Sequence, residues 1–312
     1  MSLKRWISEE TEFLDLEGPC SLESGESLPQ VRVAYRTWGR PRRNATLVCH
    51  ALTGSADADD WWADLFGPGR ALDPDRDYIV CANVLGGCYG TTGPTSRAVG
   101  AFEPYGGSFP AVTIRDIVHV QAGLLDHLGV ETLDLVVGGS MGAMQVLEWA
   151  LLYPDRVDAI APIAAGATQS AWGVALSEAQ RQAIKADANF AGGRYSLGSG
   201  PAQGLAAARS MAMISYRSPQ NFDVRFGRDA NEEGDYEVQN YLRHQGTKLV
   251  DRFDANTYLS LIDAMDSHDV GRGRGSVDDA LGSISQPALV ISVSSDGLYP
   301  AEEVATVAQA LP

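Results

Sequence analysis

The sequence predicts an α/β protein built on a doubly wound, mostly parallel sheet with a helical insertion. Short apolar runs typical of buried strands alternate with helical segments between residues 31 and 163, and a further run covers residues 287–293. Between about residues 167 and 279 the pattern is helical only. We therefore expect a discontinuous core of residues 1–166 and 280–312, with residues 167–279 as a lid over the carboxyl edge of the sheet.

The first strand differs in pattern from the others. Residues 31–35 alternate between polar and apolar side chains, which is typical of an antiparallel edge strand. The other runs are more continuously apolar and indicate buried strands of the parallel kind, at residues 46–49, 78–81, 133–137, 158–163 and 287–293. Helices are expected between them at residues 114–128 and 141–153, and Pro154 ends the second.

The helical stretch contains segments with helical spacing at residues 177–188, 202–216, 237–248 and 256–265. In doubly wound folds a lid in this position covers the site, although a packing subdomain without function would have the same pattern. The run Gly271-Arg272-Gly273-Arg274-Gly275 is most simply a flexible return to the core. An anionic substrate for its arginines is the less favoured alternative.

The charge of the chain limits its partners. A net charge of −16 argues against nucleic acid and against anionic membranes as binding partners. A halophilic source and an ordinary acidic cytosolic protein explain such a surface equally well. The four cysteines have no C-x-x-C or zinc spacing, so we expect no metal site. Because no signal peptide or membrane-spanning run stands out, a soluble, cytoplasmic protein is expected.

A G-x-S-x-G pattern lies between an expected strand and an expected helix. In Gly138-Gly139-Ser140-Met141-Gly142 the residues around the serine are small, as a very tight strand-to-helix turn requires. Such a turn exposes the serine hydroxyl, and the following helix N-terminus offers free N–H groups to an oxyanion. A spectator serine in a glycine-rich turn is the alternative, and the strand-to-helix context makes it the weaker one. The pattern therefore predicts Ser140 as a nucleophile.

The remaining parts of a serine-based site are only partly present. Asp296 directly follows the last apolar run, where the acid of such a triad belongs. The backbone amides of Met141 and Leu52 are the expected oxyanion donors. All five histidines precede Asp296, and only His50 lies near the expected site. We expect the 312 residues to lack a carboxyl-terminal strand and helix that would carry the base.

Several motifs extend over nearly the whole chain, and the blocks around residues 83–88 and 138–145 are specific. The motifs are Cys49-His50-Ala51-Leu52-Thr53-Gly54, Gly67-Pro68-Gly69, Asn83-Val84-Leu85-Gly86-Gly87-Cys88 with Gly93-Pro94, Phe109-Pro110, Thr113-Ile114-Arg115-Asp116, residues 138–145, Ile214-Ser215-Tyr216-Arg217-Ser218, and Ser294-Ser295-Asp296 with Leu298 and Pro300. Together they resemble the homoserine O-acyltransferases of methionine biosynthesis, which have the α/β-hydrolase fold.

The resemblance implies a ping-pong reaction in which Ser140 takes an acyl group from acyl-CoA and passes it to the hydroxyl of L-homoserine. Transfer of an acetyl group from acetyl-CoA is the favoured interpretation. Asp296 would be the triad acid, and Leu52 and Met141 would supply the oxyanion hole. It also implies that Arg209 and Tyr216, near two turns apart on a lid helix, hold homoserine. No metal or bound cofactor is implied, and a homodimer through the lid helices is expected.

Two departures from the family pattern stand out. Ala143 replaces a common glycine, and the Gly-His-Asp segment that would supply the base is absent, so the chain as given is expected to be nearly inactive. Four other interpretations remain open. The enzyme could transfer a succinyl group, use serine as the acceptor, or hydrolyse esters, and the chain could instead be a catalytically dead paralogue that serves as a binding or assembly partner.

Overall fold

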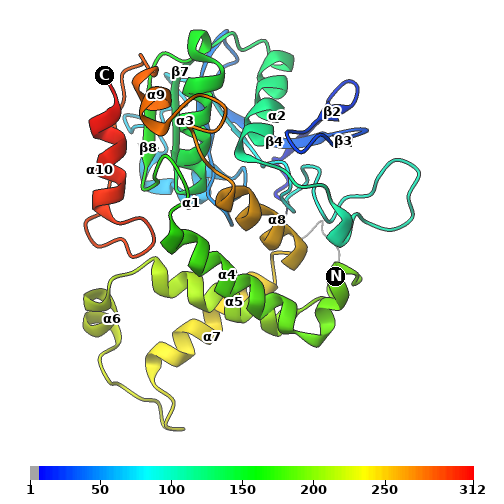
Figure 1. The fold of residues 1–312 in the computed structure, drawn as a ribbon, viewed down its shortest axis with the longest axis vertical. Coiled ribbons are helices and arrows are strands. Elements are labelled where there is room, and N and C mark those ends of the chain that lie inside the picture. Colours follow the sequence, from blue (N-terminus) through cyan, green and yellow to red (C-terminus); the bar gives the residue numbers. More distant parts are fainter. Residues whose placement is uncertain (1–6) are drawn as a thin grey trace.

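The computed structural model describes residues 7–312 and is built around one six-stranded sheet (Figure 1). The strand order is β1-β4-β6-β5-β7-β8, in which β6, β5, β7 and β8 run parallel and β4 and β1 are antiparallel additions. The expectation of a mostly parallel α/β sheet is confirmed. The strand bounds are β1 Glu12–Asp15, β4 Arg32–Trp38, β5 Asn44–Cys49, β6 Ile79–Ala82, β7 Thr132–Gly139 and β8 Ile160–Ile163, and β2 Cys20–Ser21 pairs with β3 Ser27–Leu28 in a separate hairpin.

The prediction of an edge strand at residues 31–35 was wrong. This strand, β4, lies between β6 and β1, because residues 12–15 pair with its other side. Alternating polarity indicated its antiparallel pairing correctly. The pattern of residues 31–35 could not show that β1, a short and largely exposed strand, pairs with the outer side of β4.

The prediction that residues 287–293 form a buried strand was also wrong. The segment runs parallel to β8 and bonds to it through isolated bridges, at Ile160 with Ala288 and at Ile163 with Ile291. Its side chains are exposed, with 62% of Leu289 and 47% of Val293 accessible. The segment has β8 on one side only, so its apolar composition does not produce burial.

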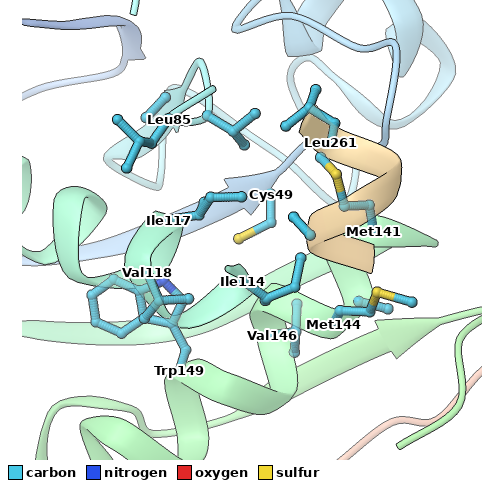
Figure 2. Close-up of a cluster of buried hydrophobic side chains, with 14 of the residues drawn as sticks. Cys49, Leu85, Ile114, Ile117, Val118, Met141, Met144, Val146, Trp149 and Leu261 are labelled. Atoms are coloured by element: carbon cyan, nitrogen blue, oxygen red, sulfur yellow. The ribbon is translucent and has the colours of Figure 1, made fainter. Parts of the chain in front are cut away.

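Two helices pack against the sheet and form the main core with it. They are α2, Ile114–His127, and α3, Met141–Leu152. Thr113 and Asp116 form a capping box that begins α2. Helix α3 is apolar on nearly every side, so it is buried along most of its length. Figure 2 shows its side chains packed among residues of β5, α2 and a later helix, α8 (Ala255–Asp266).

The structured elements of residues 171–266 are helical, as predicted for the insertion, and the helices within residues 171–250 gather below the sheet in Figure 1. Helix α4 begins earlier than expected, because the Ser170 side chain accepts a hydrogen bond from Gly173 N–H and caps it. Helix α8 was expected to be part of the lid, but its buried side chains belong to the main hydrophobic core. The bounds are α4 Ala171–Ala186, α5 Ala202–Ser215, α6 Pro219–Phe226, α7 Glu237–Val250 and α8 Ala255–Asp266; the shorter or outlying helices of the core are α1 Ala58–Trp61, α9 Val277–Gly282 and α10 Ala301–Ala310.

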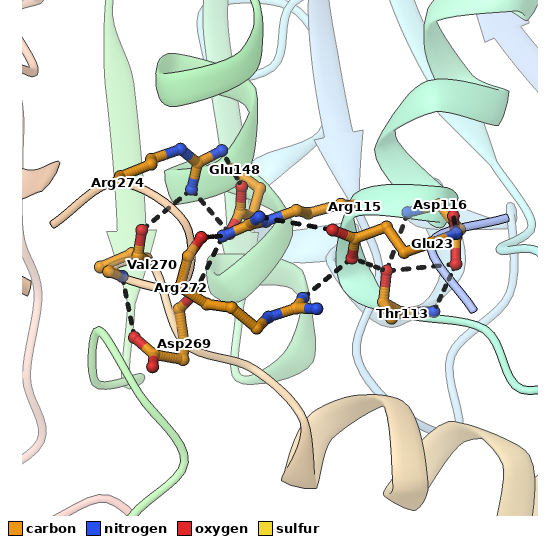
Figure 3. A network of polar contacts seen from close by, with 10 residues as sticks. Glu23, Thr113, Arg115, Asp116, Glu148, Asp269, Val270, Arg272 and Arg274 are labelled. Atoms are coloured by element: carbon orange, nitrogen blue, oxygen red, sulfur yellow. Dashed lines mark hydrogen bonds and ion pairs between the residues drawn. The ribbon is translucent and has the colours of Figure 1, made fainter. Parts of the chain in front are cut away.

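The arginine-glycine run after α8 is held by ion pairs instead of being a free connection (Figure 3). Arg272 pairs with Glu23, and Arg274 pairs with the buried Glu148 of α3. Arg115 of α2 also binds Glu148 and donates to the carbonyl oxygens of residues 269 and 272. Arg272 and Arg274 therefore attach the return segment to the core. Neither of these two residues lines the cavity described below.

Candidate active site

Ser140 lies at the sharp turn between β7 and α3, as the G-x-S-x-G pattern predicts. Its backbone has φ 56° and ψ −124°, a conformation that L-residues rarely adopt. A Cβ at position 142 would lie 2.1 Å from the carbonyl oxygen of Cys49, and one at position 138 would lie 2.7 Å from the same atom. Only glycine fits at these two positions, so the pattern has a steric cause in the structure.

A cavity of about 290 Å³ opens above this turn at the carboxyl ends of the parallel strands. It brings together residues from the core and from the lid that are far apart in the sequence. Every side chain that the sequence predicted for the site lies in its lining except Met141, whose role is assigned to its backbone. The lining is Ala51, Leu52, Thr53, Ser140, Ala164, Arg209, Tyr216, Asp296, Leu298 and Tyr299.

The Asp296 carboxylate is held by its own turn. Its Oδ1 accepts hydrogen bonds from the amides of Leu298 at 2.8 Å and Tyr299 at 3.1 Å. The Asp296 amide in turn donates to the carbonyl of Val293 at 3.0 Å. One carboxylate oxygen is thus fixed by backbone donors, which orients the group within the cavity that contains Ser140.

The two backbone amides predicted as oxyanion donors belong to Met141 and Leu52. Met141 is the first residue of α3, so its N–H belongs to the helix-terminal donors that lack an acceptor within the helix. Leu52 lies in the loop after β5, and no backbone carbonyl in the described part of the chain accepts a bond from its amide. Leu52 lines the cavity that contains Ser140, and Met141 directly follows Ser140 in the sequence, so their role as oxyanion donors stays a prediction.

Arg209 and Tyr216, from the helical lid, line the same cavity as Ser140. The Arg209 guanidinium carbon lies 5.7 Å from the centre of the Tyr216 ring. Its Nη1 is buried and has no hydrogen-bond partner. Tyr216 is 40% exposed, and partial desolvation raises the pKa of its phenol against the opposing charge of Arg209. An unpartnered, buried guanidinium nitrogen is suited to bind a carboxylate.

The histidines do not complete a triad among the described residues. His50 is buried with both ring nitrogens occupied, and desolvation lowers its pKa to about 4. His268 is buried, and desolvation together with Arg115 lowers its pKa to about 3. His119 contacts the hydroxyl of Tyr153 on the exposed face of α2. None of the five histidines lines the cavity.

Sequence reasoning missed two residues of the cavity wall. Tyr299 is buried, its hydroxyl donates to Gln169 Oε1 at 3.2 Å, and it contacts the Ser140 side chain. Burial raises the pKa of this phenol. Ala164 has a positive φ of 51° directly after β8. Neither residue belongs to a pattern that marks a site, and only their position in the fold brings them to Ser140.

Within residues 7–312 no cluster of three or more His, Cys, Asp or Glu side chains is placed to hold a metal ion. The thiols of Cys49, Cys81 and Cys88 are buried, and desolvation raises the pKa of each. They are therefore inert packing groups. No helix in the described residues is both long and apolar enough to cross a bilayer.

Comparison with known proteins gives the site its context. Residues 45–312 match the model of the alpha/beta hydrolase fold family. The homoserine O-acetyltransferase of Trichormus variabilis is 56% identical over 316 aligned positions, which cover all of this chain and 88% of the relative. The chain belongs to the homoserine O-acetyltransferase family.

The solved structures similar to this chain include a homoserine O-acetyltransferase and also an esterase. Homoserine O-acetyltransferase from Staphylococcus aureus superposes with a TM-score of 0.77 at 30% identity, covering 96% of this chain and 85% of that one. Esterase E22 superposes with a TM-score of 0.87 at 29% identity, covering 96% and 90%. The homoserine O-acetyltransferase family thus shares its fold with ester hydrolases. The fold alone therefore does not distinguish acyl transfer to an alcohol from hydrolysis, and the residues that line the cavity must be considered.

Proposed function

We propose that this enzyme transfers an acetyl group from acetyl-CoA to the hydroxyl of L-homoserine by a ping-pong mechanism. Ser140 Oγ attacks the thioester carbonyl, the C–S bond breaks, and CoA leaves as the thiol. The homoserine hydroxyl then attacks the acetyl-serine ester, which restores Ser140 and releases O-acetylhomoserine. In both steps the amides of Leu52 and Met141 stabilise the tetrahedral oxyanion.

The observation that carries this proposal is the arrangement of one cavity. A strained serine, a backbone-held carboxylate from Asp296 and an unpartnered arginine line the same 290 Å³. A plain esterase has no use for a buried guanidinium beside its nucleophile. An amino-acid acceptor does, because its carboxylate satisfies Arg209 Nη1 and places the side-chain hydroxyl toward Ser140. Tyr216 packs against that guanidinium and limits its movement.

The size and charge of the cavity favour acetyl as the acyl group. Among the described residues that line the cavity, Arg209 is the only cation, and we assign it to the acceptor. A succinyl group would bring a second carboxylate with no cation to receive it, which costs binding energy. The chemistry uses no metal or bound organic cofactor.

The test is a comparison of acyl acceptors and donors with the protein as the cell makes it. Thiol release from acetyl-CoA is followed with L-homoserine, L-serine or water alone, and products are identified by mass spectrometry. The proposal predicts parallel double-reciprocal lines and the highest kcat/KM with homoserine. Equal thiol release with and without an acceptor would instead support an esterase.

Two variants separate the roles of the cavity residues. Ser140→Ala should abolish thiol release, whereas Arg209→Met should raise the KM for homoserine while it leaves the first half-reaction measurable. Lys248→Met, on the outer face of α7, is the matched control for loss of a lid cation. If Arg209→Met left the homoserine KM unchanged, the acceptor assignment would be wrong.

The proposed assembly is a homodimer through the lid helices, in the cytoplasm. Exposed apolar side chains on these helices support it: Trp172 is 53% and Ile214 is 52% exposed. Burial of such side chains between two copies would be favourable. A monomeric mass by light scattering would remove this part of the proposal.

A further inference from the structure

The ring of His50 occupies a fixed position between two loops. It is 2% exposed. Its Nδ1 lies 2.8 Å from the carbonyl oxygen of Ala51, and its Nε2 lies 3.1 Å from the amide nitrogen of Val84. A carbonyl can only accept and an N–H can only donate, so Nδ1 carries the proton and Nε2 accepts. Because burial lowers its pKa to about 4, the ring is neutral at neutral pH.

These bonds exclude His50 as the base of Ser140 but give it another task. The Ala51 carbonyl that it holds belongs to the same peptide group as the Leu52 amide. The peptide group is planar and trans, so its N–H points away from its C=O. Whatever fixes the direction of the Ala51 oxygen therefore also fixes the direction of the Leu52 N–H.

We propose that His50 is a positioning residue that aims the Leu52 amide at the oxyanion formed on Ser140. The inference rests on the proposed function, in which the Leu52 amide is an oxyanion donor. His50 touches neither substrate nor nucleophile. It acts through one hydrogen bond to the peptide that carries the donor.

Other hydrogen bonds hold the same loop, and one of them shares the Ala51 oxygen with the histidine ring. Gly54 N–H also donates to the Ala51 oxygen at 2.8 Å, which closes a tight turn around Leu52. Gln145 Nε2 donates to the carbonyl of His50 at 3.2 Å and to that of Met141 at 3.0 Å. One side-chain amide thus ties the two loops that carry the oxyanion donors, and the His50 ring sets the tilt of the peptide between them.

A histidine that merely fills the core is the competing explanation, and two matched variants distinguish the two. In His50→Asn the side-chain nitrogen replaces Nδ1 and keeps the bond to the Ala51 oxygen, but the bond from Val84 is lost. In His50→Gln the side-chain oxygen replaces Nε2 and keeps the bond from Val84, but the bond to Ala51 is lost. Each variant loses one bond of the ring, so packing alone predicts equal effects on activity.

The first measurement is kcat and KM for acetyl transfer, below the melting temperature of both variants. Removing an oxyanion donor outright costs about 10²- to 10³-fold in kcat, and a misdirected donor costs less. We expect His50→Gln to lower kcat at least about 10-fold with little change in KM, and His50→Asn to restore most of that loss. Equal losses in the two variants would overturn the proposal.

The second measurement does not depend on homoserine or CoA. Ser140 is acetylated with ¹³C-carbonyl p-nitrophenyl acetate, and the infrared stretch of the ester carbonyl is recorded. An oriented Leu52 N–H polarises that carbonyl, so the stretch should lie at higher frequency in His50→Gln than in the wild type and in His50→Asn. If the three frequencies coincide, His50 does not position the donor, whether or not homoserine is the acceptor.

The third measurement uses the wild-type protein, so it remains decisive if a variant fails to fold. Long-range ¹H–¹⁵N NMR reports which ring nitrogen of His50 carries the proton. The proposal requires the Nδ1–H tautomer at neutral pH. The Nε2–H tautomer or a charged ring would overturn it.

Discussion

Glu148 is the residue whose loss should most weaken the attachment of the lid return to the core (Figure 3). Its side chain is 1% exposed, and its carboxylate accepts bonds from Arg115 Nε at 3.1 Å and from Arg274 Nη2 at 2.7 Å. Glu148→Gln keeps the shape of the side chain but removes its charge. The Arg274 guanidinium, 19% exposed, then remains without its anion, whereas Arg115 keeps its ion pair with Glu23 at 3.3 Å.

Breaking a buried pair by removing one partner costs about 3–5 kcal/mol in the free energy of unfolding, because a charge stays buried and uncompensated. For a chain of 312 residues that corresponds to a fall of about 5–8 °C in melting temperature. Urea unfolding followed by circular dichroism measures the change. Glu131→Gln is the matched control, since its pair with Arg43 is exposed to solvent and should contribute little to stability. Equal destabilisation by the two variants would refute the reasoning.

The other predictions concern the site and its titration. Arg209→Lys should bind homoserine more weakly than the wild type, because an ammonium cannot form the bidentate pair with a carboxylate; an unchanged KM in steady-state assays would contradict this. Stability should fall as the pH drops from about 6.5 to about 4, because the unfolded state takes up protons that buried His50 and His268 exclude. Each contributes about 1.4 kcal/mol per pH unit in that window, so His268→Asn should flatten the slope measured by urea unfolding at several pH values. Incubation with EDTA should leave transfer activity unchanged, and a loss restored by added metal would show a metal requirement.

The sequence predicted the turn at Ser140 because the steric demand is local. Gly138 and Gly142 must be small where they meet the Cys49 carbonyl, and that requirement is visible as a pattern of five residues. The buried strands were likewise visible, since parallel strands between helices are apolar on both faces. Edges were not predictable, because the partner of β4 comes from residues 12–15 and lies outside any local pattern.

Residues of the site that act through distant partners were less accessible to sequence reasoning. Arg209 on an alanine-rich helix gives no local sign of a binding role, and only the family resemblance pointed to it. His50 is noticeable by its position, yet local sequence gives no sign that an amide 34 residues away, at Val84, donates to its ring. Tyr299 reaches the cavity only because the turn at Asp296 directs it there.

The account depends most on an acetyl group passing through Ser140. Isotopically labelled acetyl-CoA is mixed with the protein as the cell makes it, the reaction is quenched within one turnover, and the peptide that contains residue 140 is analysed by mass spectrometry. The account predicts labelled acetyl on Ser140 that disappears when homoserine is added and reappears as O-acetylhomoserine. Label that never appears on Ser140, or that homoserine does not remove, would contradict it.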